Sequence, residues 1–252
     1  PSDYRMKAKE KANRTKCGSN LRILPATGEL QFEETDLFIS GRGLDFIWAR
    51  TYRSRTGRTT PMGVNWDHSY NLFVEQDAAG IAVNDGTGRR DVYFPGTNGV
   101  YTRDGFFNEG SLSNGTFTLT FPDTGRWEFK PFDGSATAGK ISSIVDRNGN
   151  LMSFAYDGAG RLGEIVDDLG RTNTLGYDGT GWLTSVTDFS GRVVRYEHAA
   201  DGNLAACISP AVTGTPNGND FPGGRNNRYN YYLGSTIETL NHNLTSITDP
   251  SG

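Results

Sequence analysis

The chain is poor in cysteine, in long apolar runs and in net charge. Its 252 residues contain only two cysteines, Cys17 and Cys207. These are too few and too far apart for a disulfide framework or a zinc site, so two unpaired thiols are favoured over a disulfide. No apolar run approaches the roughly 20 residues of a membrane span, and no secretion signal follows Pro1. The net charge of −4 gives no electrostatic reason to expect a nucleic acid partner.

Glycine and aromatic residues are plentiful. The chain has 33 glycines and 12% aromatic residues, but only 35% hydrophobic residues. This mixture suits many turns and thin sheets better than a thick helical core. Composition therefore favours an all-β scaffold of the exported kind.

From Ile141 onward the sequence repeats at intervals of 21 residues. Equivalent apolar positions are Ile141, Leu162, Leu183 and Leu204. The repeated turn positions are Asp146, Gly149, Asp157, Gly160, Asp167, Gly170, Asp178, Gly181, Asp188, Gly191 and Gly202, and the repeated aromatic positions include Tyr156, Tyr177 and Tyr196. Chance does not keep such a register, so the chain is predicted to be a repeat protein.

Each repeat unit contains two copies of one turn pattern. Asp146 and Gly149 occupy the first and fourth places of a tight turn, and Asp157 and Gly160 do the same. Aspartate at the first place bonds the backbone two residues on, and glycine tolerates the strained exit. Alternating apolar and polar residues between the turns fit short strands. A two-stranded unit is not stable alone, so the units are expected to pair edge to edge into a sheet.

The repeat resembles a known family. Tyr156–Asp157 followed by Gly160, Arg161 and Leu162 is similar to the tyrosine-aspartate (YD) repeats of Rhs proteins, teneurins and the C components of insecticidal toxin complexes. The resemblance implies antiparallel β-hairpin repeats that form a curved or spiralling sheet, part of an Rhs-type shell.

A second resemblance lies upstream of the repeats. Segments 25–30, 34–36, 50–54 and 63–70 look like the domain that opens the repeat region of bacterial Rhs proteins, with Arg50, Tyr52, Trp66, His68 and Tyr70 as its motif residues. We therefore expect a basic N-terminal tail over 1–20, an Rhs-like β domain over 21–136 and YD repeats over 137–252. The repeats contain loop insertions at about 211–223 and 232–243, and we expect the chain to be truncated within a further unit.

No residue set predicts catalysis. Asp67, His68 and Ser69 contain the groups of a triad, but adjacent residues on a strand point to opposite faces. The pairs Glu33–Glu34 and Asp167–Asp168 are sequence neighbours, whereas glycosidase carboxylates face each other across a substrate. A single loop, 218–224, has too few acidic ligands for calcium. We therefore expect no enzyme activity, no cofactor and no metal.

The aromatic positions, which include Phe154, Tyr156, Tyr177 and Tyr196, allow two interpretations. Aromatics on an exposed sheet face bind sugars, but more often they form same-face ladders that hold neighbouring strands together. The ladder is the favoured interpretation.

The resemblance predicts a structural function. The chain would be the opening portion of a shell that encloses a C-terminal effector or toxin, as in polymorphic toxins, and it would be secreted or on the cell surface of a bacterium. Its partners would be the remaining repeats and the effector of the same polypeptide, together with a secretion-apparatus or cell-surface component. The alternative is a teneurin-like or cell-wall-associated module that binds glycan or protein through its insertion loops.

Overall fold

The computed structural model describes residues 21–24 and 27–249. The predicted basic tail, with Cys17, lies outside them. Within the described part of the chain the regular elements are strands and two short 3-10 helices, η1 (Thr97–Gly99) and η2 (Glu238–Leu240). The all-β prediction is confirmed, and no helix among these residues is long and apolar enough to cross a membrane.

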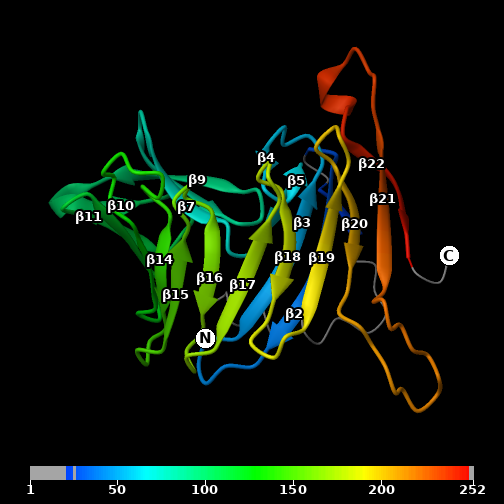
Figure 1. Cartoon of the computed structure of the whole chain (residues 1–252). Helices are drawn as coiled ribbons and strands as arrows, with labels where there is room; N and C mark the ends of the chain where they lie inside the picture. The colour runs from blue at the N-terminus through cyan, green and yellow to red at the C-terminus, as the bar shows by residue number, and fades with distance from the viewer. Residues whose placement is uncertain (1–20, 25–26, 250–252) are drawn as a thin grey trace. The chain divides into compact units, whose positions relative to one another are not determined.

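The strands follow one another along the chain (Figure 1). The first are β1 (Leu21–Leu24), β2 (Glu29–Ile39), β3 (Phe46–Arg53), β4 (Thr59–Thr60), β5 (Gly63–Val64) and β6 (Trp66–His68). The next are β7 (Leu72–Asp77), β8 (Gly80–Asp85), β9 (Arg90–Pro95), β10 (Val100–Thr102), β11 (Glu109–Ser113), β12 (Thr116–Thr120), β13 (Arg126–Phe129) and β14 (Ile141–Val145). The last are β15 (Leu151–Tyr156), β16 (Leu162–Val166), β17 (Thr172–Tyr177), β18 (Leu183–Thr187), β19 (Val193–His198), β20 (Leu204–Ile208), β21 (Asn226–Tyr232) and β22 (Asn243–Thr248).

Strands β7 to β22 belong to one 16-stranded sheet in which they lie in sequence order. The pairs are antiparallel, for example β18 with β19 and β21 with β22. A β-bulge recurs at the same position of three successive units, immediately before Tyr156, Tyr177 and His198. Because a bulge increases the local twist of a strand, the repeat contains a bend as well as its two turns.

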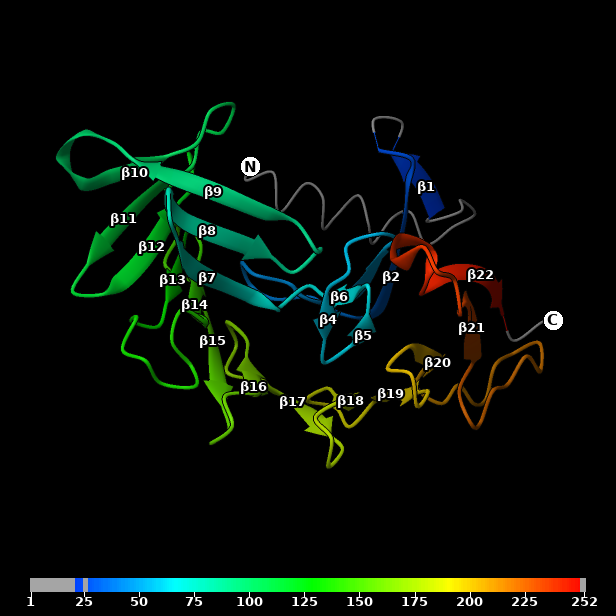
Figure 2. The same ribbon diagram turned by 90° about the horizontal axis from the view of Figure 1, so that it is seen from above.

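The described residues of the chain form two compact units. The first consists of Phe38–Trp48 and Ser69–Thr172. In it the strands from β7 to β14 are arranged in a ring (Figure 2), because β7 returns to the segment before β14. The amide of Val74 donates to the carbonyl of Gly139 at 2.7 Å, and Phe73 forms a bridge with Lys140.

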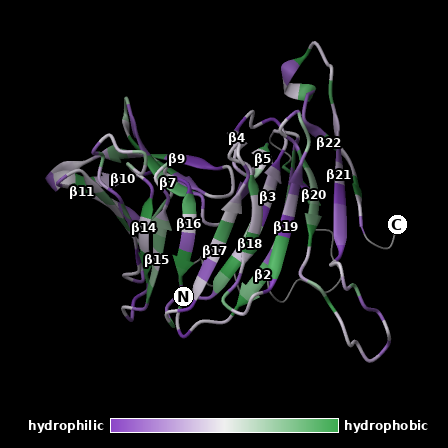
Figure 3. Cartoon of the chain, in the orientation of Figure 1, coloured by the Kyte–Doolittle hydropathy of each residue, from purple (hydrophilic) through white to green (hydrophobic). Residues whose placement is uncertain are grey.

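The second unit consists of the described residues of 21–37, Ala49–His68 and 173–249. Most of the four-stranded sheet β1-β2-β3-β6 lies in this unit, beside the repeat strands β18 to β22. Leu183, Val186 and Leu204 are fully buried on the repeat strands. Figure 3 shows hydrophilic colour along β21, although Tyr229 on this strand is buried. Burial on β21 therefore depends on aromatic residues with polar tips.

The predicted boundary at 136 does not appear in this division, in which segments from both predicted domains share each unit. The boundary therefore stays a prediction about sequence organisation.

Candidate functional site

The repeated aspartates organise the turns of the sheet. In the turn after β14, the amide of Gly149 donates to the carbonyl of Asp146 at 3.0 Å. The Asp146 carboxylate then accepts the amides of Asn148 (2.8 Å) and Asn150 (3.0 Å). The same pattern recurs at the repeat positions Asp157, Asp167, Asp178 and Asp188. Each of these carboxylates caps backbone donors that the turn would leave without a strand partner.

The glycines that end these turns adopt left-handed backbone angles. Gly170, for example, has φ +75°. The other repeated glycines in this region are Gly149, Gly160, Gly181, Gly191 and Gly202. Only glycine adopts this conformation without a steric cost, so the turn chemistry explains the period. Ala199 replaces aspartate in the last of these turns, and there Asp201 caps the amide of Asn203 at 3.0 Å.

Three turns add an arginine to the carboxylate. The Nε atoms of Arg161, Arg171 and Arg192 lie 2.6–2.7 Å from Asp157, Asp167 and Asp188. The side chains of Asp167 and Asp188 are fully buried. For Asp188 burial raises the pKa, but hydrogen bonds from Ser190 and Arg192 outweigh it, and the pKa is lowered. Asp188 therefore stays charged and serves the turn.

The opening motif forms a buried charged cluster in the second unit. Arg50 is completely buried, and its Nε lies 2.9 Å from Asp36. Its Nη1 donates to the hydroxyl of Tyr229 at 2.5 Å, and its guanidinium lies over the rings of Phe32, Trp66 and Tyr229. A buried guanidinium requires both a counter-charge and hydrogen-bond acceptors. Asp36 supplies the counter-charge and accepts from Nε, and Tyr229 accepts from Nη1.

Asp36 also binds two residues of the repeat strands. The hydroxyl of Tyr196 donates to its carboxylate at 2.7 Å, and the thiol of Cys207 lies 3.6 Å away. Burial, followed by the negative charge of Asp36, raises the pKa of Tyr196 well above its ordinary value. Burial likewise raises the pKa of Cys207, which is a free cysteine. The raised pKa keeps the thiol neutral, and a neutral thiol is a poor nucleophile.

Tyr52 and Trp66 join the opening motif to the last two strands. The Tyr52 hydroxyl donates to the carbonyl of His242 at 2.9 Å and accepts the amide of Leu244 at 3.0 Å. The indole of Trp66 donates to the hydroxyl of Tyr231 at 2.8 Å. Burial raises the pKa of Tyr52 to about 12. These hydrogen bonds hold β21 and β22 to the opening segment.

His68 and Tyr70, the other two motif residues, lie in different units. His68 is buried on β6 opposite Arg50, and burial lowers its pKa to about 3. Its amide donates to the Asp67 carboxylate at 2.9 Å. In the first unit the Tyr70 hydroxyl accepts the amide of Ile47 at 2.8 Å, and its ring contacts Phe154 at 5.7 Å.

Two of the repeated aromatic residues, Phe154 and Tyr196, make contacts with residues outside the repeats, whereas a ladder would join neighbouring repeat strands. Phe154 contacts Tyr70, and the hydroxyl of Tyr196 binds Asp36. Tyr156 donates its hydroxyl to the carbonyl of Ile141 at 2.8 Å and faces the ammonium groups of Lys130 and Lys140. Segments upstream of the repeats thus provide these contacts of Phe154 and Tyr196. A period in the sequence cannot reveal such partners.

The two insertion loops have different surfaces. In the first, Val212 pairs with Phe221, and the Asp220 carboxylate accepts the amides of Gly214 (2.9 Å) and Thr215 (2.8 Å). Asp220, the acidic residue of the loop compared with a calcium site, therefore binds backbone amides of its own loop. The second loop exposes apolar side chains, namely Tyr232, Leu233, Ile237 and Leu240. Among the described residues no group of acidic, histidine and cysteine side chains is arranged to hold a metal ion.

These features define an all-β repeat protein whose repeat positions build turns and whose opening segment packs on repeat strands. A family model described as a domain of unknown function, DUF6531, matches residues 22–93, and the RHS Repeat model matches residues 177–211. The chain thus contains an Rhs repeat, and the Rhs-type YD repeat predicted from the sequence is confirmed. Each match lies within one of the predicted domains. The repeats have a structural role, because they form the sheet.

The chain also has partial similarity to solved structures. One is the Tc holotoxin pore of Photorhabdus luminescens, with 12% identity and a TM-score of 0.36, covering 91% of this chain and 10% of that one. Another is the TcdB2–TccC3 complex without its hypervariable C-terminal region, with 14% identity and a TM-score of 0.35, covering 84% of this chain and 12% of that one. The chain thus spans about a tenth of the length of these proteins. No curated protein sequence matches it.

Proposed function

We propose that the chain is the opening portion of an Rhs-type β-shell that encloses and shields a C-terminal effector or toxin of the same polypeptide. The observation that carries the proposal is the packing of the opening motif on the repeats. Arg50 binds Tyr229, Trp66 binds Tyr231 and Tyr52 binds Leu244. An opening segment fastened in this way covers the strands on which it lies and would cap the start of the shell.

The chemistry of the repeat supports containment rather than reaction. The carboxylates at positions such as Asp146 and Asp188 are engaged in turns, and the thiol of Cys207 is buried. The sheet adds strands in sequence order up to β22, so its extent is set by the number of repeats. In this account enclosure requires further repeats, and the effector occupies the space that they surround.

The partners and location follow from this proposal. The remaining repeats and the effector are the first partners, and a secretion-apparatus or cell-surface component is a further one. The protein is exported, to the medium or to the cell surface of a bacterium. The proposal includes no enzyme activity for this part of the chain.

Protease protection of the full-length protein tests the proposal. Intact protein should show no effector activity and should keep its effector uncut by protease, whereas a site-specific cut between repeats should release activity. Matched cleavage sites in the surface turn Gly158–Ala159 and in the first insertion loop, near Gly218, keep the sheet pairing unchanged until protease is added. Full activity of the uncut protein would contradict containment.

A second function is a surface module that binds glycan or protein. The exposed Tyr232, Leu233, Ile237 and Leu240 favour it, because they bring four apolar side chains to the surface of the second insertion loop and exposed apolar surface can mark an interaction site. A glycan array and a pull-down would test it with the wild type and with a variant in which residues 233–240 are replaced by a short glycine linker. Specific binding that is lost in the variant would support the module, and binding by neither protein would reject it.

A further inference from the structure

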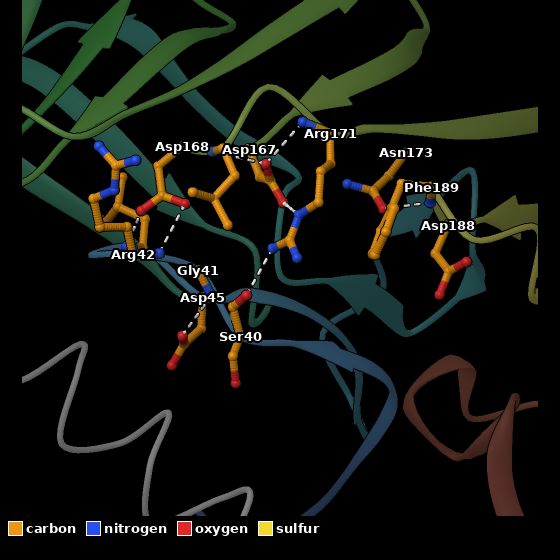
Figure 4. A network of polar contacts seen from close by, with 12 residues as sticks. Ser40, Gly41, Arg42, Asp45, Asp167, Asp168, Arg171, Asn173, Asp188 and Phe189 are labelled. Carbon is orange, nitrogen blue, oxygen red and sulfur yellow. Dashed lines mark hydrogen bonds and ion pairs between the residues drawn. The ribbon is translucent and has the colours of Figure 1, made fainter.

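The segment Ser40–Asp45, here called the docking loop, joins β2 to β3 and lies against the repeat turns of the first unit. Three consecutive backbone amides of this loop donate to one carboxylate, that of Asp168 (Figure 4). The distances are 3.2 Å from Arg42, 2.5 Å from Gly43 and 2.9 Å from Leu44. Successive amides that converge on an anion form a recognised carboxylate-binding geometry, and such charge-assisted bonds are stronger than neutral ones.

Further contacts fix the loop at the same place. Arg171 donates to the carbonyl of Ser40 at 2.7 Å, and the amide of Gly41 donates to Asp45 at 3.0 Å. A Cβ atom on Gly41 would collide with the carbonyl oxygen of Leu44. The tight fold of the loop therefore depends on glycine at 41.

Gly43 brings the loop close to a second turn. A Cβ atom on Gly43 would overlap the side chains of Asn150 and Asp146. The loop thus lies beside two equivalent turns, 146–150 and 167–171, and the second provides the Asp168 carboxylate that binds three of its amides. The two turns differ in the residue that follows the turn aspartate, which is Arg147 in the first and Asp168 in the second.

The two adjacent aspartates of the second turn have separate tasks. Asp167 makes the turn, since its carboxylate accepts the amides of Leu169 and Arg171 at 3.0 and 2.9 Å. Asp168 occupies the next position, where the equivalent turns have Arg147 and Phe189. Turn geometry does not require an acid there, because those two turns form without one. Asp168 is therefore a departure from the repeat whose carboxylate serves the docking loop.

We propose that Asp168 determines which repeat turn the docking loop binds. Its negative charge satisfies three amides at once, whereas Arg147 in the neighbouring turn places a cation where the amides need an acceptor. The loop lies directly between β2 and β3, so this contact sets the position of the β2–β3 connection on the repeat turns of the first unit. Asp168 is thus a positioning residue for assembly, and the ligand of the loop amides is a carboxylate.

Amide hydrogen exchange, measured by NMR on the whole chain, tests the proposal. Replacing Asp168 with alanine should speed exchange at Arg42, Gly43 and Leu44 at least tenfold and should speed tryptic cleavage after Arg42. Exchange in the strands β15 and β16 should be unchanged. Asp168→Asn, which keeps the size of the side chain but loses its charge, should have a smaller effect in the same direction. Glu164→Ala, which removes an exposed carboxylate of β16 in the same unit, is the matched control.

Two further measurements separate positioning from a simple packing contact. Added formate should restore the protection of the three amides in Asp168→Ala, whereas chloride at equal ionic strength should not, because only a carboxylate bridges them. Exchanging the two residues, in Arg147→Asp with Asp168→Arg, should restore protection with new contacts to the turn at 146–150. Unchanged exchange in both Asp168→Ala and Asp168→Asn would overturn the proposal, as would a charge-exchanged protein whose three amides remain unprotected.

Discussion

The hydroxyl of Tyr52 accepts the backbone amide of Leu244 at 3.0 Å across a sequence separation of 192 residues. The same hydroxyl donates to the carbonyl of His242. One side chain of the opening segment thereby completes the backbone hydrogen bonding at the start of β22. Its removal affects two backbone groups together.

Replacing Tyr52 with phenylalanine should destabilise the protein. The change removes only the hydroxyl, so the amide of Leu244 loses this acceptor and the carbonyl of His242 keeps only the 3.5 Å contact with Asn65. The expected cost is roughly 1–3 kcal/mol in the free energy of unfolding. Urea unfolding followed by tryptophan fluorescence measures the change. Tyr232→Phe, on a half-exposed side chain of β21, should have almost no effect. Equal losses in the two variants would show that the Tyr52 hydroxyl has no special role.

Replacing Arg50 with methionine should be more costly, because it leaves the Asp36 carboxylate buried without its cation. Breaking a buried ion pair from one side typically costs about 3–5 kcal/mol in the free energy of unfolding. Replacing both partners, in Arg50→Met with Asp36→Leu, should recover part of that loss, since no charge then remains buried. A double-mutant cycle measures the coupling. Strictly additive losses would mean that Arg50 and Asp36 do not act as a pair.

Two glycines of the repeat turns should respond differently to alanine. Gly170 and Gly158 both have open space where a Cβ would lie, but only Gly170 has a positive φ, +75°. Gly170→Ala should therefore lower the free energy of unfolding by about 1–2 kcal/mol through backbone strain alone. Gly158→Ala should be neutral or slightly stabilising. Thermal unfolding of the two variants compares them, and similar changes in Tm would refute the strain argument.

Stability should fall as the pH drops below about 6.5, and His68 should account for part of the loss. Burial lowers the pKa of folded His68 to about 3 from its ordinary 6.5. The unfolded chain therefore binds a proton first, so the contribution is complete above pH 6.5 and declines as the pH falls towards 3. His68→Gln should flatten the stability profile between pH 6.5 and 4.5 in urea titrations. An unchanged slope in this variant would show that His68 does not contribute.

The local parts of the structure could be predicted from the sequence. The spacing of Asp146, Gly149 and their equivalents predicts turns, because the hydrogen bonds that make them lie within five residues. The strands between the turns follow from apolar alternation. The predictions of an Rhs-type repeat and of an all-β fold depend on these local patterns, and both are confirmed.

The long-range contacts could not be predicted. Nothing in the period indicates that Tyr196 and Tyr229 meet Asp36 and Arg50, because those partners lie outside the repeat. In the sequence Asp168 is noticeable only as a member of the carboxylate pair Asp167–Asp168, which does not fit a glycosidase. Its three amide donors come from a loop more than 120 residues upstream. The departure from the repeat at this position was the available signal.

The state of the effector in the intact full-length protein decides whether the sheet encloses it. If the sheet encloses its cargo, protease treatment should leave the effector uncut and inactive until a cut is made between repeats, and activity should then appear together with effector cleavage. An effector that is active and digested at the same rate before and after the repeats are cut would contradict the account.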